Sequence, residues 1–188
     1  MEFITYTKNT DKSMLLQHDI FISPSAKICE GAKLYRGVKV YGDSYIGHDA
    51  ELHSNIEICD SYISKGCKVF TGFIKECEIG ENCLIKPFTH IINTEIGANS
   101  VIGNFTCINN SCIGAKAKIS CLVNLNQLDA GNNITICSGV CCEADSDDSI
   151  TLGDNVELGI NTTIIKSVVI SDNTKIKQNS IITKDILD

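Results

Sequence analysis

Four histidines are the side chains best suited to proton transfer in this chain of 188 residues: His18, His48, His53 and His90. The pKa of an imidazole lies near neutrality, so histidine is the usual general base when a hydroxyl or amine loses its proton while attacking a carbonyl. Histidine is also a common zinc ligand. Which of these roles applies depends on how the surrounding chain positions each ring.

The chain positions its side chains through a six-residue repeat. From Ile22 to Tyr62 an aliphatic residue recurs every sixth position, and a second residue, mostly small or aliphatic, follows each one four positions later. The first series is Ile22, Ile28, Leu34, Val40, Ile46, Leu52 and Ile58, and the second is Ala26, Ala32, Val38, Ser44, Ala50, Ile56 and Tyr62. A six-residue period fits neither a helix nor an alternating strand. It predicts a solenoid in which three hexapeptides make one triangular coil and both series point inward.

After Ile58 the repeat shortens at intervals. The predicted inward aliphatics are Ile63, Val69, Ile74, Ile79, Ile85, Ile91, Ile96, Ile102, Ile108, Ile113, Ile119 and Leu125. The steps 58–63, 74–79, 91–96 and 108–113 are five residues long and recur after every third strand, so we expect one tightened corner, stacked coil on coil. The short step 69–74 is expected at another corner. Gly131 and Cys137 are predicted to replace the next aliphatics, before the register resumes at Leu152.

These patterns predict one domain with a short cap. Residues 1–21 lie outside the repeat and are expected to form an edge strand or cap, since the open end of a solenoid needs cover. Residues 22–188 are expected to form about nine coils, with an external loop at 142–149. The acidic segment Glu143–Asp148 in that loop is interpreted as a solvated loop, with cation binding or cover of a cleft as the alternatives.

The amino-acid composition indicates the cellular compartment and excludes some classes of partner. The 11 cysteines form no C-x-x-C pair, and Cys67, Cys83, Cys112 and Cys141 are predicted at small inward positions, where a thiol replaces Ala or Ser. With no secretory-type apolar run near Met1, this predicts free thiols and a cytoplasmic location. The net charge of −7 argues against a nucleic-acid partner, and no window is apolar enough for a membrane span.

Longer motifs in the second half of the chain suggest a family. They are EIGENCLIKPFTHI at 78–91, IGNFT at 102–106 and the coil–loop–coil segment at 133–159. From about Ile79 to Ile186 the chain resembles the hexapeptide-repeat (left-handed β-helix) transferase family, and within it the acetyltransferase domain of bifunctional glucosamine-1-phosphate acetyltransferase / N-acetylglucosamine-1-phosphate uridyltransferase. The resemblance implies an all-β, single-stranded left-handed parallel β-helix. It also implies a homotrimer, with acetyl-CoA as co-substrate and no resident metal.

The resemblance also implies site residues. The family's catalytic histidine aligns with Cys121, and a substrate-binding arginine aligns with His90, so these two are the catalytic candidates. The substrate-binding candidates are Asn110, Asn124 and Thr135, which align with a lysine, a tyrosine and an asparagine. The acetyl-CoA candidates are Ser138, Gly139, Ile160 and Gln178. Cys121 could act as a nucleophile if a neighbour such as Lys118 lowered its pKa, and His90 as a base or an anion ligand.

The expected function is therefore that of an acyl-CoA-dependent O- or N-acyltransferase acting on a small sugar-like or sugar-nucleotide-like acceptor. The main alternative is a non-catalytic β-helix that serves as a structural or binding module, because a thiol stands where the family has its base. A minor alternative is a zinc protein resembling the γ-class carbonic anhydrases, since His48 and His53 have the offset of two of that family's ligands. Its third histidine would fall near residue 12, where Asp11 and Lys12 stand.

Overall fold

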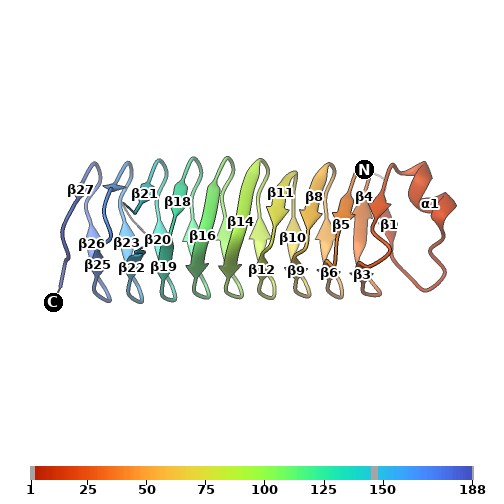
Figure 1. The fold of residues 1–188 in the computed structure, drawn as a ribbon, viewed down its shortest axis with the longest axis horizontal. Helices are drawn as coiled ribbons and strands as arrows, with labels where there is room; N and C mark the ends of the chain where they lie inside the picture. Colours follow the sequence, from red (N-terminus) through yellow and green to blue (C-terminus); the bar gives the residue numbers. More distant parts are fainter. Residues whose placement is uncertain (1–2, 145–147, 188) are drawn as a thin grey trace.

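The computed structural model describes residues 3–144 and 148–187, which form a left-handed parallel β-helix of about nine coils (Figure 1). Each coil contributes short strands to three faces of a triangular prism, named the first, second and third face in chain order. A 10-stranded sheet makes the first face, and a 17-stranded sheet wraps the second and third. The corners are named by the faces they join.

Most strands are short, as a six-residue repeat requires. The first face contains β1 (Phe3–Thr5), β4 (Lys33–Tyr35), β7 (Glu51–Leu52), β10 (Lys68–Val69), β13 (Leu84–Ile85), β15 (Val101–Ile102), β17 (Lys118–Ile119), β20 (Thr135–Ile136), β23 (Glu157–Leu158) and β26 (Lys175–Ile176). The second face contains β2 (Phe21–Ile22), β5 (Lys39–Tyr41), β8 (Ile56–Cys59), β11 (Gly72–Lys75), β18 (Asn124–Asn126), β21 (Cys141–Glu143), β24 (Thr163–Ile164) and β27 (Ile181–Ile182). The third face contains β3 (Lys27–Ile28), β6 (Tyr45–Ile46), β9 (Tyr62–Ile63), β12 (Glu78–Ile79), β19 (Leu128–Ala130), β22 (Ile150–Leu152) and β25 (Val169–Ile170). Two longer strands, β14 (Thr89–Ile96) and β16 (Cys107–Ile113), run through corner 2–3 and belong to both faces.

The aliphatic repeat fills the prism, as predicted. Ile28, Ile46 and Ile63 are in-register partners on successive coils of the third face. Every member of the predicted series from Ile63 to Leu125 is at most 2% exposed. In the first coils Ile22 and Ile28 are only half-buried, because fewer coils cover them there. The stack gives each coil its hydrophobic cover, which a solenoid needs in place of a central core.

The tightened corner predicted from the five-residue steps is corner 2–3. A residue with φ between 46° and 54° lies in each short step; these residues are Asp60, Glu76, Asn93, Asn110 and Gln127. Four of the steps were predicted, and the fifth, at 125–130, was not. A residue with positive φ bends the chain more sharply, so the corner can be made with one residue fewer.

Three predicted inward residues are wrong, and the short corner explains each. Tyr62 is 45% exposed. Cys112 is exposed and Cys141 only half-buried. At Tyr62 and Cys112 the step into the third face is only five residues, so the small inward position falls one residue earlier, at the buried Ser61 and Ser111. Cys141 is displaced by the missed step at 125–130, which moves the inward position to the buried Val140.

The missed step at 125–130 also shifts the next two inward positions. Ala130 and Ile136 are buried there, at 4% and 0% exposure, instead of the predicted Gly131 and Cys137, so the core has no gap at these coils. In one coil, Gln127 alone connects the second-face strand β18 to the third-face strand β19. In the next coil, the connection from β21 to β22 is longer and consists of residues 144–149. Residues 145–147 lie outside the described part, so the role of the acidic loop stays a prediction.

The N-terminal segment packs on the first coils. Strand β1 pairs antiparallel with β4, so it covers the open edge of the first face. The short helix α1 (Lys12–Gln17) follows, and the Asp11 carboxylate caps it by accepting a hydrogen bond from Met14 N at 3.0 Å. Ile4 and Ile20 are buried against the coils.

Candidate functional site

Corner 1–2 carries Cys121 and the four residues predicted to bind acetyl-CoA. Cys121 Sγ lies 3.3 Å from Ser138 Oγ on the next coil. Backbone hydrogen bonds between coils continue this stack to Ile160 and Gln178, one residue per coil. Gly139, with φ of 73°, makes the turn after Ser138. The structure therefore brings Cys121 and the predicted acetyl-CoA residues into one line along the prism.

An open groove of about 760 Å³ lies on the first face beside this corner. The side chains in its lining that could contact a ligand include Lys86, Phe105, Lys118, Cys121, Leu122 and Ser138. Two ammonium groups, a thiol and a hydroxyl thus share a wall with two exposed apolar side chains. Such a lining suits a ligand that has both an anionic part and an apolar part.

The second face carries the other catalytic candidate, on the far side of corner 1–2 from the groove. His90, Cys107, Asn124 and Cys141 are partners on four successive coils. The His90 ring stacks on Phe73, with centroids 5.2 Å apart. His90 and Asn124 therefore lie on one face, with Cys107 between them, and neither lines the groove next to Cys121.

One buried amide on this face lacks a full set of partners. Asn109 Nδ2 donates to Cys107 Sγ at 3.3 Å. Its Oδ1 atom is buried and has no hydrogen-bond partner among the described residues. An unpaired buried carbonyl is unfavourable, so a donor from a bound hydroxyl or amine would be stabilised there.

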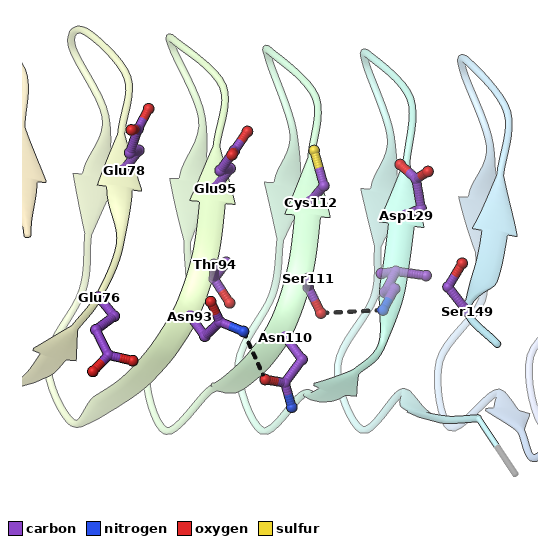
Figure 2. Close-up of a pocket in the computed structure, with 11 residues that line it drawn as sticks. Glu76, Glu78, Asn93, Thr94, Glu95, Asn110, Ser111, Cys112, Asp129 and Ser149 are labelled. Atoms are coloured by element: carbon purple, nitrogen blue, oxygen red, sulfur yellow. Dashed lines mark hydrogen bonds between the residues drawn. The ribbon is translucent and has the colours of Figure 1, made fainter. Parts of the chain in front are cut away.

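Asn110 lies at corner 2–3, in a second groove of about 440 Å³ (Figure 2). Asn93 Nδ2 donates to Asn110 Oδ1 at 3.0 Å, and Asn110 Nδ2 donates to Asn126 Oδ1 at 3.2 Å. This amide ladder supports the left-handed turns of the corner. Its amides are occupied by one another, which favours a structural role for Asn110.

Figure 2 also shows a row of carboxylates that sequence reasoning missed. Glu78, Glu95, Cys112 and Asp129 are partners on successive coils of the third face, and all line the second groove. The sequence carried a signal, because each residue directly precedes an inward residue at coil spacing. The sequence carried a signal for Phe105 and Leu122 as well, because they occupy positions at which other coils have Gly or Asn.

The predicted site residues are thus distributed around the prism. Thr135 lies on the first face as the partner of Lys118, outside the lining of both grooves. Of the predicted residues, only Cys121 and Ser138 line one groove together. Within a single copy of the chain, His90 lies on the second face two coils before Asn124, and Asn110 lies across that face at corner 2–3.

The cysteines differ in their capacity for thiolate chemistry. Burial raises the pKa of Cys77 to about 11 and that of Cys142 to about 12, which keeps both protonated. Partial burial, followed by the nearby Glu95 and Asp129 carboxylates, also raises the pKa of Cys112. Cys121 is exposed and lies in the groove that holds two lysines.

His48 and His53 occupy different surroundings. His48 Nδ1 is 3.0 Å from Glu30 O. The His53 ring is sandwiched between Tyr35 and Phe70, with centroids 4.4 and 3.9 Å away, and burial lowers its pKa. Among residues 3–144 and 148–187, no group of three or more His, Cys, Asp or Glu side chains is placed to hold a metal ion.

The known proteins to which this chain is similar are transferases. A family model described as bacterial transferase hexapeptide (six repeats) matches residues 76–110. The bifunctional protein GlmU of Clostridium botulinum (strain ATCC 19397 / Type A) is 32% identical over 170 residues, which cover 88% of this chain and 37% of that protein. GlmU of Listeria monocytogenes serotype 4b (strain CLIP80459) is 28% identical over 172 residues, covering 89% of this chain and 38% of that protein. The chain therefore spans little more than a third of the length of these relatives.

A solved structure shares the architecture. The UDP-N-acetylglucosamine acyltransferase from Campylobacter jejuni superimposes with a TM-score of 0.56 at 23% identity, covering 89% of this chain and 68% of that one. At this identity the match supports the fold. No helix in the described part of the chain is long and apolar enough to cross a bilayer.

Proposed function

Because the chain belongs to the hexapeptide-repeat transferase family, we propose that it is an acyl-CoA-dependent acyltransferase. It moves an acyl group, in the simplest case acetyl, to a hydroxyl or amine of a sugar or sugar-nucleotide-like acceptor. It acts in the cytoplasm as a homotrimer, and it needs no resident metal. The Campylobacter jejuni acyltransferase acts on UDP-N-acetylglucosamine by name, and the acceptor class is carried over from it and from the resemblance given above.

The groove beside corner 1–2 is the observation that carries this proposal. Cys121 faces Ser138 at 3.3 Å, and the stack continues through Ile160 to Gln178. A line of backbone and small polar groups along the prism suits an extended molecule such as a CoA thioester. Lys86 and Lys118 add positive charge for its phosphates.

Acyl transfer requires the acceptor to lose a proton as it attacks the thioester carbonyl. His90 is the histidine of the second face, where Asn124 and the unpaired Asn109 carbonyl can bind acceptor hydroxyls. Cys121 stands at the edge between that face and the groove, where donor and acceptor would meet. Its thiol orients the thioester, or attacks it directly. In the second case the acyl group moves to the Cys121 sulfur, CoA leaves as a thiol with the proton that Cys121 gives up, and the acceptor then displaces Cys121 from the acyl group.

The test is acceptor-dependent release of free CoA. The purified full chain is incubated with acetyl-CoA and longer acyl-CoAs, each with a panel of amino sugars and sugar nucleotides, and product masses are recorded. We expect turnover with at least one pair, and a loss of about 10²-fold or more in Cys121→Ala. Cys29→Ala, a thiol at the opposite end of the prism, should leave the rate unchanged.

One result would favour the non-catalytic alternative. If acyl-CoA raises the melting temperature of the chain but no acceptor releases CoA, the protein is a binding module built on a transferase fold. The thiol at Cys121, in place of the family's histidine, is the observation that keeps this second candidate open.

A further inference from the structure

Three successive strands of the second face, β14, β16 and β18, carry no Asp, Glu, Lys or Arg. Their outward side chains on this face are an imidazole, an aliphatic chain, a thiol and three amides: His90, Ile92, Cys107, Asn109, Asn124 and Asn126. These six residues are named the neutral patch. The next strands on either side, β11 and β21, carry Lys75 and Glu143. The loss of charge is therefore confined to the coils that carry the candidate base.

Corner 2–3 changes in the same way at the same coils. Asn93, Asn110 and Gln127 turn the corner beside the neutral patch, whereas Asp60 and Glu76 turn it on the two preceding coils. Amides both donate and accept hydrogen bonds, so a surface rich in them suits a ligand that carries several hydroxyls. A phosphate or carboxylate would lose its water there without gaining a cation, which is unfavourable.

Asn109 is the member of the neutral patch whose hydrogen bonding is incomplete. Its Nδ2 atom donates to Cys107 Sγ at 3.3 Å, so the thiol fixes which end of the amide is engaged. Its Oδ1 atom is buried and has no partner among residues 3–144 and 148–187. A structural amide pairs its carbonyl, as Asn132 does by accepting a hydrogen bond from Ala115 N at 2.9 Å. An unpaired carbonyl costs stability, and a bound ligand that supplies the donor recovers that cost.

The candidate base lies next to this amide. His90 is the in-register neighbour of Cys107 on the adjacent strand, and Cys107 holds Asn109. To accept a proton from the acceptor, the His90 ring must itself be neutral, so it supplies no positive charge to the patch. The group that reacts at His90 and the group that binds at Asn109 can therefore belong to one small, uncharged ring.

We propose that the neutral patch binds an uncharged, hydroxyl-bearing sugar ring of the acceptor. Asn109 selects this ring by accepting a hydrogen bond from one of its hydroxyls or from its neutral amine, and Cys107 is the positioning residue that orients the amide. The reacting ring carries no phosphate or carboxylate, and in a sugar nucleotide the diphosphate lies beyond the patch. This inference deepens the proposed function and rests on it.

Matched acceptors test the selection against charge. Hexoses and amino sugars that differ only by a ring phosphate, such as glucosamine and glucosamine 6-phosphate, are compared by calorimetric binding to the full chain and by acetyl-CoA turnover. We expect the uncharged member of a pair to bind about tenfold more tightly or better, since the phosphate must be desolvated without a partner. Tighter binding of the phosphorylated member would overturn the proposal.

Asn109→Leu separates a binding amide from a structural one. Leucine has a similar size and no carbonyl, so the melting temperature should rise or stay unchanged when the unpaired group is removed. The acceptor KM should rise about tenfold with kcat little changed, as expected when ground-state binding is lost. Asn132→Leu is the matched control: it removes a paired amide outside the patch, so it should lower the melting temperature and keep the KM. An Asn109→Leu chain that loses stability and keeps its KM contradicts the assignment.

Two substitutions at Cys107 test its positioning role. A serine hydroxyl accepts the same hydrogen bond from Asn109, so Cys107→Ser should keep the wild-type KM. Cys107→Ala frees the amide and should raise the acceptor KM about three- to tenfold. Both variants should keep kcat, because the base is untouched. The same KM in the serine and alanine variants would show that the thiol does not hold Asn109 for the acceptor.

The outcomes separate this inference from the proposed function. A chain that binds uncharged sugars through Asn109 but never releases CoA supports the neutral patch and contradicts the transferase. A chain that releases CoA most efficiently with ring-phosphorylated sugars supports the transferase and overturns the patch. A chain that neither binds sugars nor releases CoA contradicts both.

Discussion

Cys121 Sγ and Ser138 Oγ lie 3.3 Å apart on successive coils of corner 1–2. The pair opens onto a groove whose lining also includes Lys86 and Lys118, so the thiol is accessible and shares the groove with two ammonium groups. None of the other ten cysteines combines these features, since most are wholly or partly buried and the exposed Cys112 lies among carboxylates. We therefore expect Cys121 to be the thiol that reacts most readily in the folded chain.

Alkylation rates should distinguish the two exposed thiols. In the native chain at pH 7.5 we expect iodoacetamide to modify Cys121 faster than Cys112, because the raised pKa of Cys112 leaves less of it as thiolate. Buried Cys77 and Cys142 should react only after unfolding. Peptide mass spectrometry gives each rate, and a CoA thioester should slow Cys121 alone. Equal protection of both thiols would place the ligand elsewhere.

Histidine substitutions test which face binds the acceptor. His90→Ala should lower acyl transfer by about 10²–10⁴-fold, the usual contribution of a general base. The double variant His48→Gln, His53→Phe should keep its activity. Strand β7, which precedes His53, is four strands from β17 on the first face, about 19 Å at the spacing of neighbouring strands. An inactive double variant beside an active His90→Ala would move the site to the first coils.

The fold was predictable because a repeat averages out local ambiguity. One aliphatic series with five short steps placed every inward aliphatic residue from Ile63 to Leu125 correctly. The errors at Tyr62, Cys112 and Gly131 share one cause, which is the five-residue step at corner 2–3. Such a step shifts both the small and the aliphatic inward position by one residue, and the spacing of the sequence does not show both shifts. Cap packing of β1 on β4 has no repeat to reveal it.

The site was harder to predict than the fold. The structure stacks Cys121, Ser138, Ile160 and Gln178 in one line, because residues one coil apart lie over one another. Their role in binding acetyl-CoA stays a prediction. Alignment gave no indication that His90 and Thr135 lie on different faces from that line, which depends on where each strand falls around the triangle. No single motif predicts the carboxylate row or the exposed Phe105 and Leu122. Both become visible only when equivalent positions on three coils are compared.

The glycines that follow the third-face strands, at corner 3–1, should be intolerant of an added side chain. An added Cβ at Gly97 would lie 2.4 Å from Ala115 N and 2.6 Å from Gly114 C, both backbone atoms of the next coil. We expect Gly97→Ala to lower the free energy of unfolding by about 1–3 kcal/mol, as overpacking does. Ser64 occupies the same column and already carries a side chain, so Ser64→Ala should change stability little. Urea unfolding of both variants measures the difference, and equal midpoints would show that the coils can separate to accept a methyl group.

His53 should make stability depend on pH between neutrality and mild acid. Its ring lies between Tyr35 and Phe70, and Nε2 is 3.7 Å from Glu51 Oε2, while Lys68 Nζ shares that carboxylate at 3.5 Å. Burial lowers the folded-state pKa of His53 below its ordinary value of 6.5, outweighing the attraction of Glu51. The unfolded chain therefore binds a proton below pH 6.5 while the folded chain resists it, so stability is full above that pH and falls as the pH decreases.

The measurement is the change in melting temperature between pH 7.5 and pH 5.5 in wild type and variants. His53→Phe continues the aromatic stack without a titrating group, so its melting temperature should fall less over this interval than that of the wild type. His48→Gln removes a solvent-exposed imidazole and should follow the wild type. The pKa of Glu51 is lowered, chiefly by its hydrogen bond from Lys33, so the stability it contributes is lost only below its ordinary value of 4.5 and does not enter the interval. If His53→Phe loses as much stability as the wild type on acidification, the buried ring accepts its proton without cost and the sandwich is not a barrier to protonation.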